Sequence, residues 1–280
     1  MAEIVTAGAI MAGVALFFGI VLAVANLKLK VEEDPRIDVV EEKLPGSNCG
    51  ACGQPGCRAF AEALVGEKAT PGMCTVNTAA GVEDIASFLG VAAGFAEKRV
   101  ARLACAGGSS SVRRLAAYEG VSSCRSAHVV SAGGRSCAWG CLGLGDCQRA
   151  CTFNVIAMNA DDLPVVEVDG CTACGDCVDV CPLNLFSIKP LADLVLVQCA
   201  SPLGGEAAMA ACDVACDACG RCAADAPEGA IEMVNGLPVL RLPAMVPEQA
   251  TFRCPTGAIA FVQGEQFQGR DAAAPRRRYA

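Results

Sequence analysis

Twenty cysteines in a chain of 280 residues constrain this protein more than any other feature of its sequence. Thiols at this density indicate either a disulfide framework or metal ligation, and their spacing separates the two. One run, CTACGDCVDVCP, contains Cys171, Cys174, Cys177 and Cys181 and ends at Pro182. In a CxxCxxCxxxCP run, three thiolates bind one iron–sulfur cluster and the fourth binds a neighbouring cluster. The spacing therefore predicts 4Fe-4S clusters, with zinc or disulfides as the alternatives.

The partner of this run is expected upstream, because two-cluster ferredoxins exchange the distant cysteine between their halves. The upstream cysteines are spaced CxxxCxxxxxCxxxC, which is wider than the standard run, and Thr152 replaces the usual proline. One cluster is therefore predicted on Cys137, Cys141, Cys147 and Cys181. A second is predicted on Cys151, Cys171, Cys174 and Cys177.

Two further groups of four cysteines predict one cluster each. CDACGRC begins a second module, but Ala226 stands where a ferredoxin would place its remote ligand, and the downstream CxxCxxC is missing. This half-degenerate module is predicted to hold one cluster on Cys216, Cys219, Cys222 and Cys254. Near the N-terminus, NCGACGQPGCRAFAEAL and PGMC predict a separate module with the ligands Cys49, Cys52, Cys57 and Cys74.

Four cysteines remain after these assignments: Cys105, Cys124, Cys199 and Cys212. Two of them precede each ferredoxin-like module, which indicates a weak internal duplication. If the modules are related by a pseudo-twofold axis, these four thiols converge on a fifth cluster, and all twenty cysteines divide into five sets of four. The alternatives are free thiols, disulfides or a small zinc site.

An uncharged stretch at residues 4–26 predicts a transmembrane helix. Its 23 residues would form a helix roughly 35 Å long, enough to cross a bilayer core. A signal peptide is the alternative, but it would need a basic segment first, and Glu3 is the only charge before this stretch. Lys28 and Lys30 follow directly, which favours a single-pass anchor in the inner (cytoplasmic) membrane with the body on the cytoplasmic side.

The remaining patterns predict an α+β protein. Apolar residues at helical spacing predict helices over 58–67 and 81–102, and hairpin patterns lie at 155–168 and 230–242, the second with the turn pair Asn235 and Gly236. The predicted order is a transmembrane helix (1–26), a charged linker (27–44), a small helical 4Fe-4S module (45–103), a two-cluster ferredoxin-like unit with its preceding cysteine pair (104–190), a second half-degenerate ferredoxin-like unit with its cysteine pair (191–268) and a disordered tail (269–280).

Charge and missing motifs exclude several function classes. A net charge of −8 argues against a nucleic-acid binder, and no GxxxxGK[ST] loop, strand-borne GxGxxG or CxxCH is present. We therefore expect no flavin, haem or nucleotide site in this chain and no catalytic residue of its own. The single histidine, His128, is expected to be an ordinary surface or core side chain.

In combination and order, these motifs resemble the B subunit of the Rnf complex. The resemblance covers nearly the whole chain, from the N-terminal span through NCGACGQPGCRAFAEAL, SCAWGCLGLGDCQRAC and CTACGDCVDVCP to the second ferredoxin-like unit. It implies an electron-transfer subunit of a membrane complex that couples electron flow between ferredoxin and NAD to sodium or proton translocation. The implied partners are the other Rnf subunits, soluble ferredoxin or flavodoxin, and membrane lipid, without nucleic acid.

Two questions follow from this resemblance. The alternative function is a membrane-anchored iron–sulfur scaffold or redox sensor without turnover. An acidic ferredoxin would dock only on a local basic patch, because like net charges disfavour association. The candidates for such a patch are Arg99, Arg102, Arg113 and Arg114, and an ordinary solvated face is the alternative.

Overall fold

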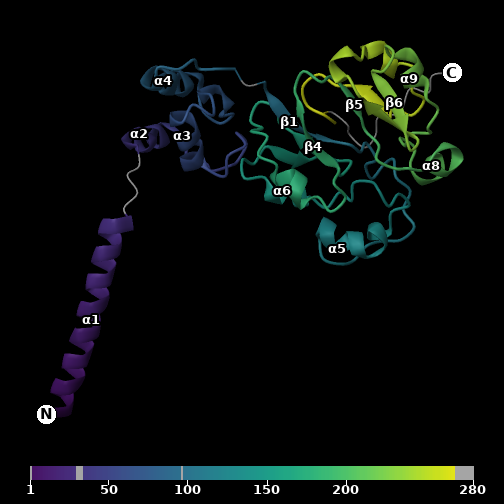
Figure 1. The fold of residues 1–280 in the computed structure, drawn as a ribbon. Coiled ribbons are helices and arrows are strands. Elements are labelled where there is room, and N and C mark those ends of the chain that lie inside the picture. Colours follow the sequence, from purple (N-terminus) through teal and green to yellow (C-terminus); the bar gives the residue numbers. More distant parts are fainter. Residues whose placement is uncertain (1, 30–33, 96, 269–280) are drawn as a thin grey trace.

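The computed structural model describes residues 2–29, 34–95 and 97–268, and its architecture mixes helices with short strands. Helix α1 (Ala2–Leu29) stands apart, a helical module of α2, α3 and α4 follows, and a larger body holds the sheets (Figure 1). Residues 30–33 of the predicted linker and the predicted tail at 269–280 lie outside the described residues.

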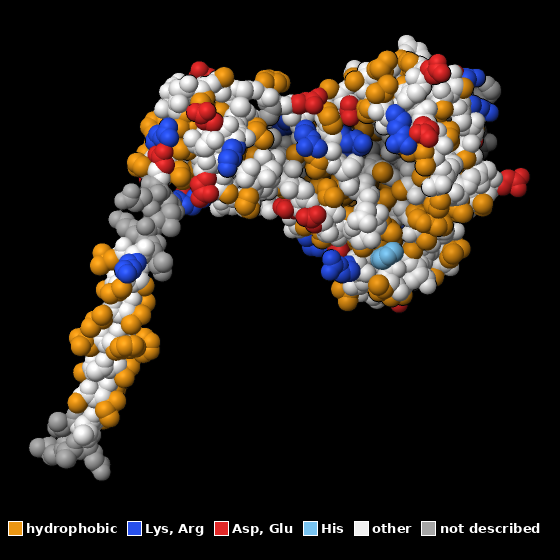
Figure 2. Space-filling view, viewed as in Figure 1, with side chains coloured by type: hydrophobic (Ala, Val, Ile, Leu, Met, Phe, Trp, Pro, Cys, Tyr) orange, Lys and Arg blue, Asp and Glu red, His pale blue; other side chains and the backbone are white. Residues whose placement is uncertain are grey.

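Helix α1 is apolar on all sides. Its stretch Thr6–Lys28 is long and apolar enough to cross a membrane and packs against no other described part of the chain. Apolar side chains cover the face of it that Figure 2 shows, and Phe17 and Leu22 are 63% and 68% exposed. A helix that is apolar all round needs an apolar environment, which a bilayer supplies. Membrane association follows from this feature.

The helical module packs three helices around a small core. It consists of α2 (Pro35–Lys43), α3 (Cys57–Val65) and α4 (Ala79–Leu89), with the 3-10 helix η1 (Pro71–Met73) between α3 and α4. Arg58 of α3 contacts Glu41 of α2 at 2.7 Å, and Lys43 pairs with Asp84 of α4. The core of this module consists of the buried residues Val40, Leu44, Phe60, Ala61, Leu64 and Ile85.

The structure of this module differs from two expectations drawn from the sequence. Helix α2 lies within the stretch predicted as a linker, where Asp34 caps its first turn by accepting from the Arg36 amide at 2.9 Å. The helix predicted over 81–102 ends at Leu89, because Gly90 adopts the left-handed conformation with a φ of 69°. Residues 99–103 form a strand instead.

Within the described residues, the body contains four two-stranded antiparallel sheets. They pair β1 (Arg99–Leu103) with β4 (Phe186–Pro190), β2 (Ile156–Met158) with β3 (Pro164–Val166), β5 (Val195–Val197) with β8 (Ile259–Phe261), and β6 (Ile231–Val234) with β7 (Leu237–Leu240). The pairs β2–β3 and β6–β7 fall within the two predicted hairpins. Asn235 and Gly236, both with positive φ, form the turn between β6 and β7.

Short helices connect these strands. They are α5 (Cys124–Val129), α6 (Asp146–Ala150), α7 (Asp176–Val180), α8 (Gly205–Ala211) and α9 (Arg221–Asp225), with the 3-10 helices η2 (Ser131–Gly134), η3 (Pro243–Met245) and η4 (Glu248–Thr251). Helices α6 and α7 pack against each other. A left-handed glycine precedes each of α6, α7 and α9, and in each case a cysteine follows within the first two helical residues.

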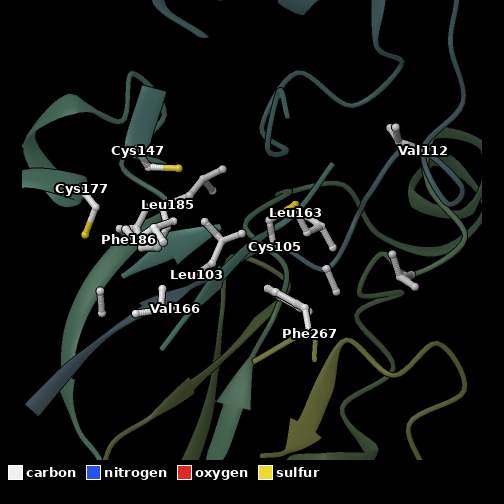
Figure 3. Packing of buried hydrophobic residues seen from close by; sticks show 14 of the residues in the cluster. Leu103, Cys105, Val112, Cys147, Leu163, Val166, Cys177, Leu185, Phe186 and Phe267 are labelled. Atoms are coloured by element: carbon white, nitrogen blue, oxygen red, sulfur yellow. The ribbon is translucent and has the colours of Figure 1, made fainter. Parts of the chain in front are cut away.

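The core of the body is built from aliphatic residues and cysteines together. Leu103, Leu163, Val166, Leu185 and Phe186 lie among the sulfur atoms in Figure 3. The C-terminal segment closes this core, because the Gln266 side chain attaches it to the backbone of β1. It accepts from the Leu103 amide at 2.9 Å and donates to the Leu103 carbonyl at 2.8 Å.

Truncating Leu163 tests this packing. Leu163 is 0% exposed, so replacing it with alanine removes buried methyl groups and leaves a cavity. We expect Leu163→Ala to lower the free energy of unfolding by about 2–5 kcal/mol. Leu115 is 78% exposed, so Leu115→Ala is the matched control and should change it by less than about 0.5 kcal/mol. Anaerobic thermal melts measure both, and equal melting temperatures would contradict the assignment.

Candidate metal centres

Each of five cavities in the described part of the chain is lined by four cysteines, and together they account for all twenty. The five cavities are similar in size. We name them the Cys49 set (Cys49, Cys52, Cys57, Cys74), the Cys171 set (Cys151, Cys171, Cys174, Cys177), the Cys141 set (Cys124, Cys141, Cys147, Cys181), the Cys199 set (Cys105, Cys137, Cys199, Cys212) and the Cys216 set (Cys216, Cys219, Cys222, Cys254).

Three of these sets have the same members as the groups predicted from spacing: the Cys49, Cys171 and Cys216 sets. In the Cys171 set, Ala173 and Gly175 have positive φ values of 62° and 99°, so the loop curls around the cavity. Apolar side chains of Phe153, Val155 and Val166 also line this cavity. Local loops with CxxC spacing therefore bring most of these cysteines together without help from distant segments.

The other two sets exchange one cysteine relative to the prediction. Cys124 lines the cavity of Cys141, Cys147 and Cys181, and Cys137 lines that of Cys105, Cys199 and Cys212. The structure therefore differs from the prediction in two groupings. Cys137 does not share a cavity with Cys141, and Cys124 does not share one with Cys105.

Asp146 explains why Cys124 lies beside Cys147. Its carboxylate accepts from the Ser123 hydroxyl at 3.0 Å and from the Arg125 amide at 3.2 Å, which fixes the start of α5 against α6. Burial alone would raise the pKa of Asp146, but these hydrogen bonds hold it below its ordinary value. The contact joins residues far apart in sequence, so spacing rules gave no signal for it.

A second group of long-range contacts assembles the Cys199 set. The Ala106 amide donates to the Gln198 carbonyl at 2.8 Å, and Val112 pairs with Cys212 in an isolated β-bridge. These contacts bring Cys105 next to Cys199 and Cys212. Cys137 completes the set, while Cys141 lines the neighbouring cavity.

Glycines let the backbone approach the sulfur atoms of the Cys199 set. A Cβ at Gly107 would lie 3.1 Å from the Cys212 Sγ, and one at Gly140 would lie 3.4 Å from the Cys137 Sγ. Both glycines line the cavity. A larger residue would crowd the sulfurs, so the site fits a group that fills the space among four sulfurs.

All twenty cysteines are free thiols, and burial opposes the ionisation of the most enclosed ones. Burial raises the pKa of Cys105, Cys141, Cys147 and Cys177 to about 12, and neighbouring cysteines add to the increase. Four thiolates around one cavity therefore need positive charge among them, which bound iron would supply. Soft sulfur donors suit iron–sulfur clusters, so the residues fit this cofactor.

The five sets follow one another in a single file. The Thr75 hydroxyl, next to Cys74, donates to the Thr172 carbonyl at 2.7 Å and joins the Cys49 set to the Cys171 set. Helices α6 and α7 join the Cys171 set to the Cys141 set through Cys147 and Cys177 (Figure 3). The charge of Cys177 contributes, after burial and Cys124, to the raised pKa of Cys147.

The file continues from the Cys141 set to the Cys216 set. The Cys141 amide donates to the Cys105 Sγ at 3.2 Å, which places the Cys199 set directly beside the Cys141 set. Burial raises the pKa of Cys216 to about 11, with Cys199 among the neighbouring charges that contribute. The spatial order is therefore Cys49, Cys171, Cys141, Cys199 and Cys216 sets.

The arginines considered for a docking patch divide into two kinds. Arg99, Arg113 and Arg114 are exposed, and the last two pair with Asp213 at 3.4 Å and Asp162 at 3.8 Å. Arg102 is only 2% exposed and lies in the core, so the prediction that it contributes to a surface patch is wrong. Its hydrogen bond to Gly264 places its side chain under the C-terminal segment. His128 is exposed.

The cysteine-lined cavities and the apolar helix α1 define a membrane-associated iron–sulfur protein. A family model named FeS, for an Fe-S cluster, matches residues 44–76. The chain is 38% identical over 264 residues to the B subunit of the proton-translocating ferredoxin:NAD(+) oxidoreductase complex of Clostridium ljungdahlii, which covers 92% of this chain and 93% of the relative.

Two other relatives carry similar names. The chain is 39% identical over 201 residues to the B subunit of the Na(+)-translocating ferredoxin:NAD(+) oxidoreductase complex of Acetobacterium woodii, covering 72% of this chain and 60% of the relative. It is 37% identical over 229 residues to the B subunit of the ion-translocating oxidoreductase complex of Methanosarcina acetivorans, covering 82% and 87%. The chain belongs to the family of Rnf complex B subunits, as its motifs implied.

Paired serine substitutions test the exchanged cysteines. Cys124 and Cys147 share one cavity, so Cys124→Ser/Cys147→Ser should remove one cluster, a loss of about four irons. Cys137 and Cys147 line different cavities, so Cys137→Ser/Cys147→Ser should remove two clusters, about eight irons. Iron analysis of anaerobically purified protein measures both losses. The grouping predicted from spacing gives the opposite pattern: about eight irons lost from Cys124→Ser/Cys147→Ser and about four from Cys137→Ser/Cys147→Ser. Observing that pattern would overturn the structural grouping.

Proposed function

We propose that this chain carries electrons through a membrane-bound ferredoxin:NAD oxidoreductase complex of the Rnf type. Its five cysteine sets would each hold a 4Fe-4S cluster, and it would accept electrons from ferredoxin or flavodoxin and pass them to partner subunits. The observation that supports this proposal most strongly is the single file of five similar cavities, each lined by four cysteines. Family membership supports the proposal.

The ligand pattern supports a two-cluster ferredoxin-like unit at residues 104–190. Cys151 leaves its own run to join the Cys171 set, and Cys181 leaves its run to join the Cys141 set. This exchange of the distant cysteine is the ferredoxin pattern. Residues 191–268 would form the second, half-degenerate unit around the Cys216 set, and residues 45–103 the helical cluster module.

A cluster fits these sites better than zinc or a disulfide. Structural zinc is held by four ligands converging on one atom at about 2.0–2.3 Å. Within the described ranges, no three His, Cys, Asp or Glu side chains converge in that way. The thiols instead surround cavities, as expected for a cofactor of several atoms.

The single file supports electron transfer over a scaffold or sensor role. Helix α3, which carries Cys57 of the Cys49 set, lies in the module that follows α1, and α9, which carries Cys222 of the Cys216 set, lies in the larger body away from that module (Figure 1). Cys219 of the Cys216 set is exposed. A scaffold does not require a row of neighbouring cofactors that runs from one end of the protein to the other. We propose that the chain faces the cytoplasm, because Lys28 lies in the last turn of the apolar helix and thiols stay reduced there. The flavins, the NADH site and the ion path would belong to other subunits.

Rapid mixing with reduced ferredoxin tests the proposal. Five clusters of four irons give about 20 irons per anaerobically purified chain, with acid-labile sulfide in equal amount. Ferredoxin should reduce these clusters and bleach the absorbance near 400 nm. Cys174→Ser should retain about 16 irons, because it removes one cluster. A colourless protein with stoichiometric zinc would contradict the cluster assignment, and a full iron content without bleaching would favour the scaffold or sensor.

Removing helix α1 tests membrane association. The full chain should stay in the membrane fraction after a carbonate wash, because a helix of this length and polarity is stable only in the bilayer. A variant that begins at residue 34 should move to the soluble fraction with unchanged iron content, since α1 packs against none of the cysteine sets. A truncated protein that stays with the membrane would assign the attachment to the body instead.

A further inference from the structure

Two cysteine loops of this chain follow a similar backbone path but carry different polar residues directly after their first cysteine. CTACGDC (171–177) and CDACGRC (216–222) each supply three cysteines to one set. The backbone φ is 62° at Ala173 and 61° at Ala218, and a glycine with positive φ follows two residues later in both loops. Thr172 and Asp217 therefore stand at the same position of the two loops. Each of them lines the cavity of its own set.

The Thr172 hydroxyl is a buried polar group whose place the fold alone does not explain. Thr172 is 8% exposed, and its Oγ1 atom is buried without a hydrogen-bond partner among the described residues. A buried hydroxyl in this state is costly. Burial raises the pKa of Cys174, and the Thr172 hydroxyl is among the groups that act against that increase, so it lies beside the thiols of its set. A cluster in this cavity would supply the acceptor that the hydroxyl lacks.

Asp217 has the opposite character at the same position. Its Oδ1 atom accepts from the Cys219 amide at 3.1 Å and so engages a donor that could otherwise bind a cluster sulfur. Burial raises the pKa of Cys216 to about 11, and the charges of Cys199, Cys254 and Asp217 add to that increase. The loop of the Cys216 set therefore has a carboxylate where the loop of the Cys171 set has a free hydroxyl donor.

We propose that these two residues set the reduction potentials of their clusters in opposite directions. The Thr172 hydroxyl donates to a sulfur atom in the Cys171 set and raises the potential there, and the Asp217 carboxylate lowers the potential of the Cys216 set. This inference rests on the proposed function. Reduction adds one electron from an external donor to an already anionic cluster, without breaking a bond or moving a proton. A donor to the sulfur atoms stabilises the added charge, and a nearby carboxylate opposes it. Together the two effects favour electron transfer from the Cys216 set towards the Cys171 set.

A purely structural role is the competing explanation for Thr172. This residue joins the body to the helical module, because its carbonyl accepts from the Thr75 hydroxyl at 2.7 Å. That contact uses the backbone, which any residue at position 172 would supply. Valine has nearly the shape of threonine and keeps the carbonyl, so Thr172→Val removes the hydroxyl alone. The contact with Thr75 therefore explains neither the Thr172 hydroxyl nor its burial.

The potentials of the two clusters separate these roles. Electron paramagnetic resonance during a potentiometric titration follows each cluster of the full anaerobic chain, and Cys174→Ser and Cys222→Ser identify the two signals by removing each in turn. We expect Thr172→Val to lower the ratio of reduced to oxidised cluster in the Cys171 set about threefold at a fixed potential, a shift of about 30 mV for one electron. Thr172→Ser, which restores a hydroxyl, should largely restore the ratio. Asp217→Asn should raise the ratio in the Cys216 set about threefold.

Each variant carries its own control, because the signal of the other set should stay unchanged. Asp213→Asn is the matched charge control: Asp213 is exposed and lines none of the five cavities, so both ratios should stay as in the wild type. An unmoved ratio in Thr172→Val or in Asp217→Asn, with full iron content, would overturn this inference alone. So would a shift in Asp213→Asn equal to that in Asp217→Asn. An iron-free wild-type chain would overturn the proposed function and this inference with it.

Pulsed electron paramagnetic resonance in deuterium oxide gives a second, independent readout. A hydroxyl that donates to the cluster places an exchangeable deuteron beside the reduced centre, so its coupling should be present in the wild type and in Thr172→Ser and lost in Thr172→Val. An unchanged coupling in Thr172→Val would overturn the role of Thr172. If Thr172→Val loses about four irons, retention of that iron by Thr172→Ser assigns the loss to the missing hydroxyl and supports the proposal, and loss from both variants overturns it.

Discussion

Buried sulfur is the constraint on which this structure depends. The cysteines occupy core positions that aliphatic side chains fill in most small domains, and their thiols resist ionisation there. Strands of three to five residues and helices of five to seven cannot bury enough apolar surface to hold such a body together. Bonds between iron and sulfur would supply what the hydrophobic effect cannot, as structural metals do in other small domains. The cofactor would then be both the redox centre and the core.

Continuity between the cavities arises from contacts that each join two neighbouring sets. Thr75 and Thr172 link the helical module to the body, α6 and α7 pack against each other, and the Cys141 amide reaches the Cys105 sulfur. Each contact involves a ligand or a residue close to it in sequence. The spacing between neighbouring sets is therefore fixed by the same backbone that supplies the ligands. Electron transfer along the file needs this rigidity more than it needs a moving part.

The sequence predicted what is local and missed what is distant. The Cys49, Cys171 and Cys216 groups could be read from spacing because one loop brings most of their members together. The exchange of Cys124 and Cys137 depends on Asp146 and on the bridge between Val112 and Cys212, which join segments that no motif relates. The burial of Arg102 depends on the C-terminal segment crossing β1, so composition alone placed it on the surface.

The interleaving of the sets also orders the maturation of the protein during synthesis. The Cys49 set is complete once Cys74 has left the ribosome, because all its members lie within one short stretch. Cys105 must wait until Cys212 is translated before its site closes, while the Cys171 and Cys141 sets close in between. At the usual pace of translation, the Cys105 thiol therefore stays without its partner Cys212 for several seconds. A nascent chain built in this way depends on a reducing cell and on a ready supply of iron and sulfide.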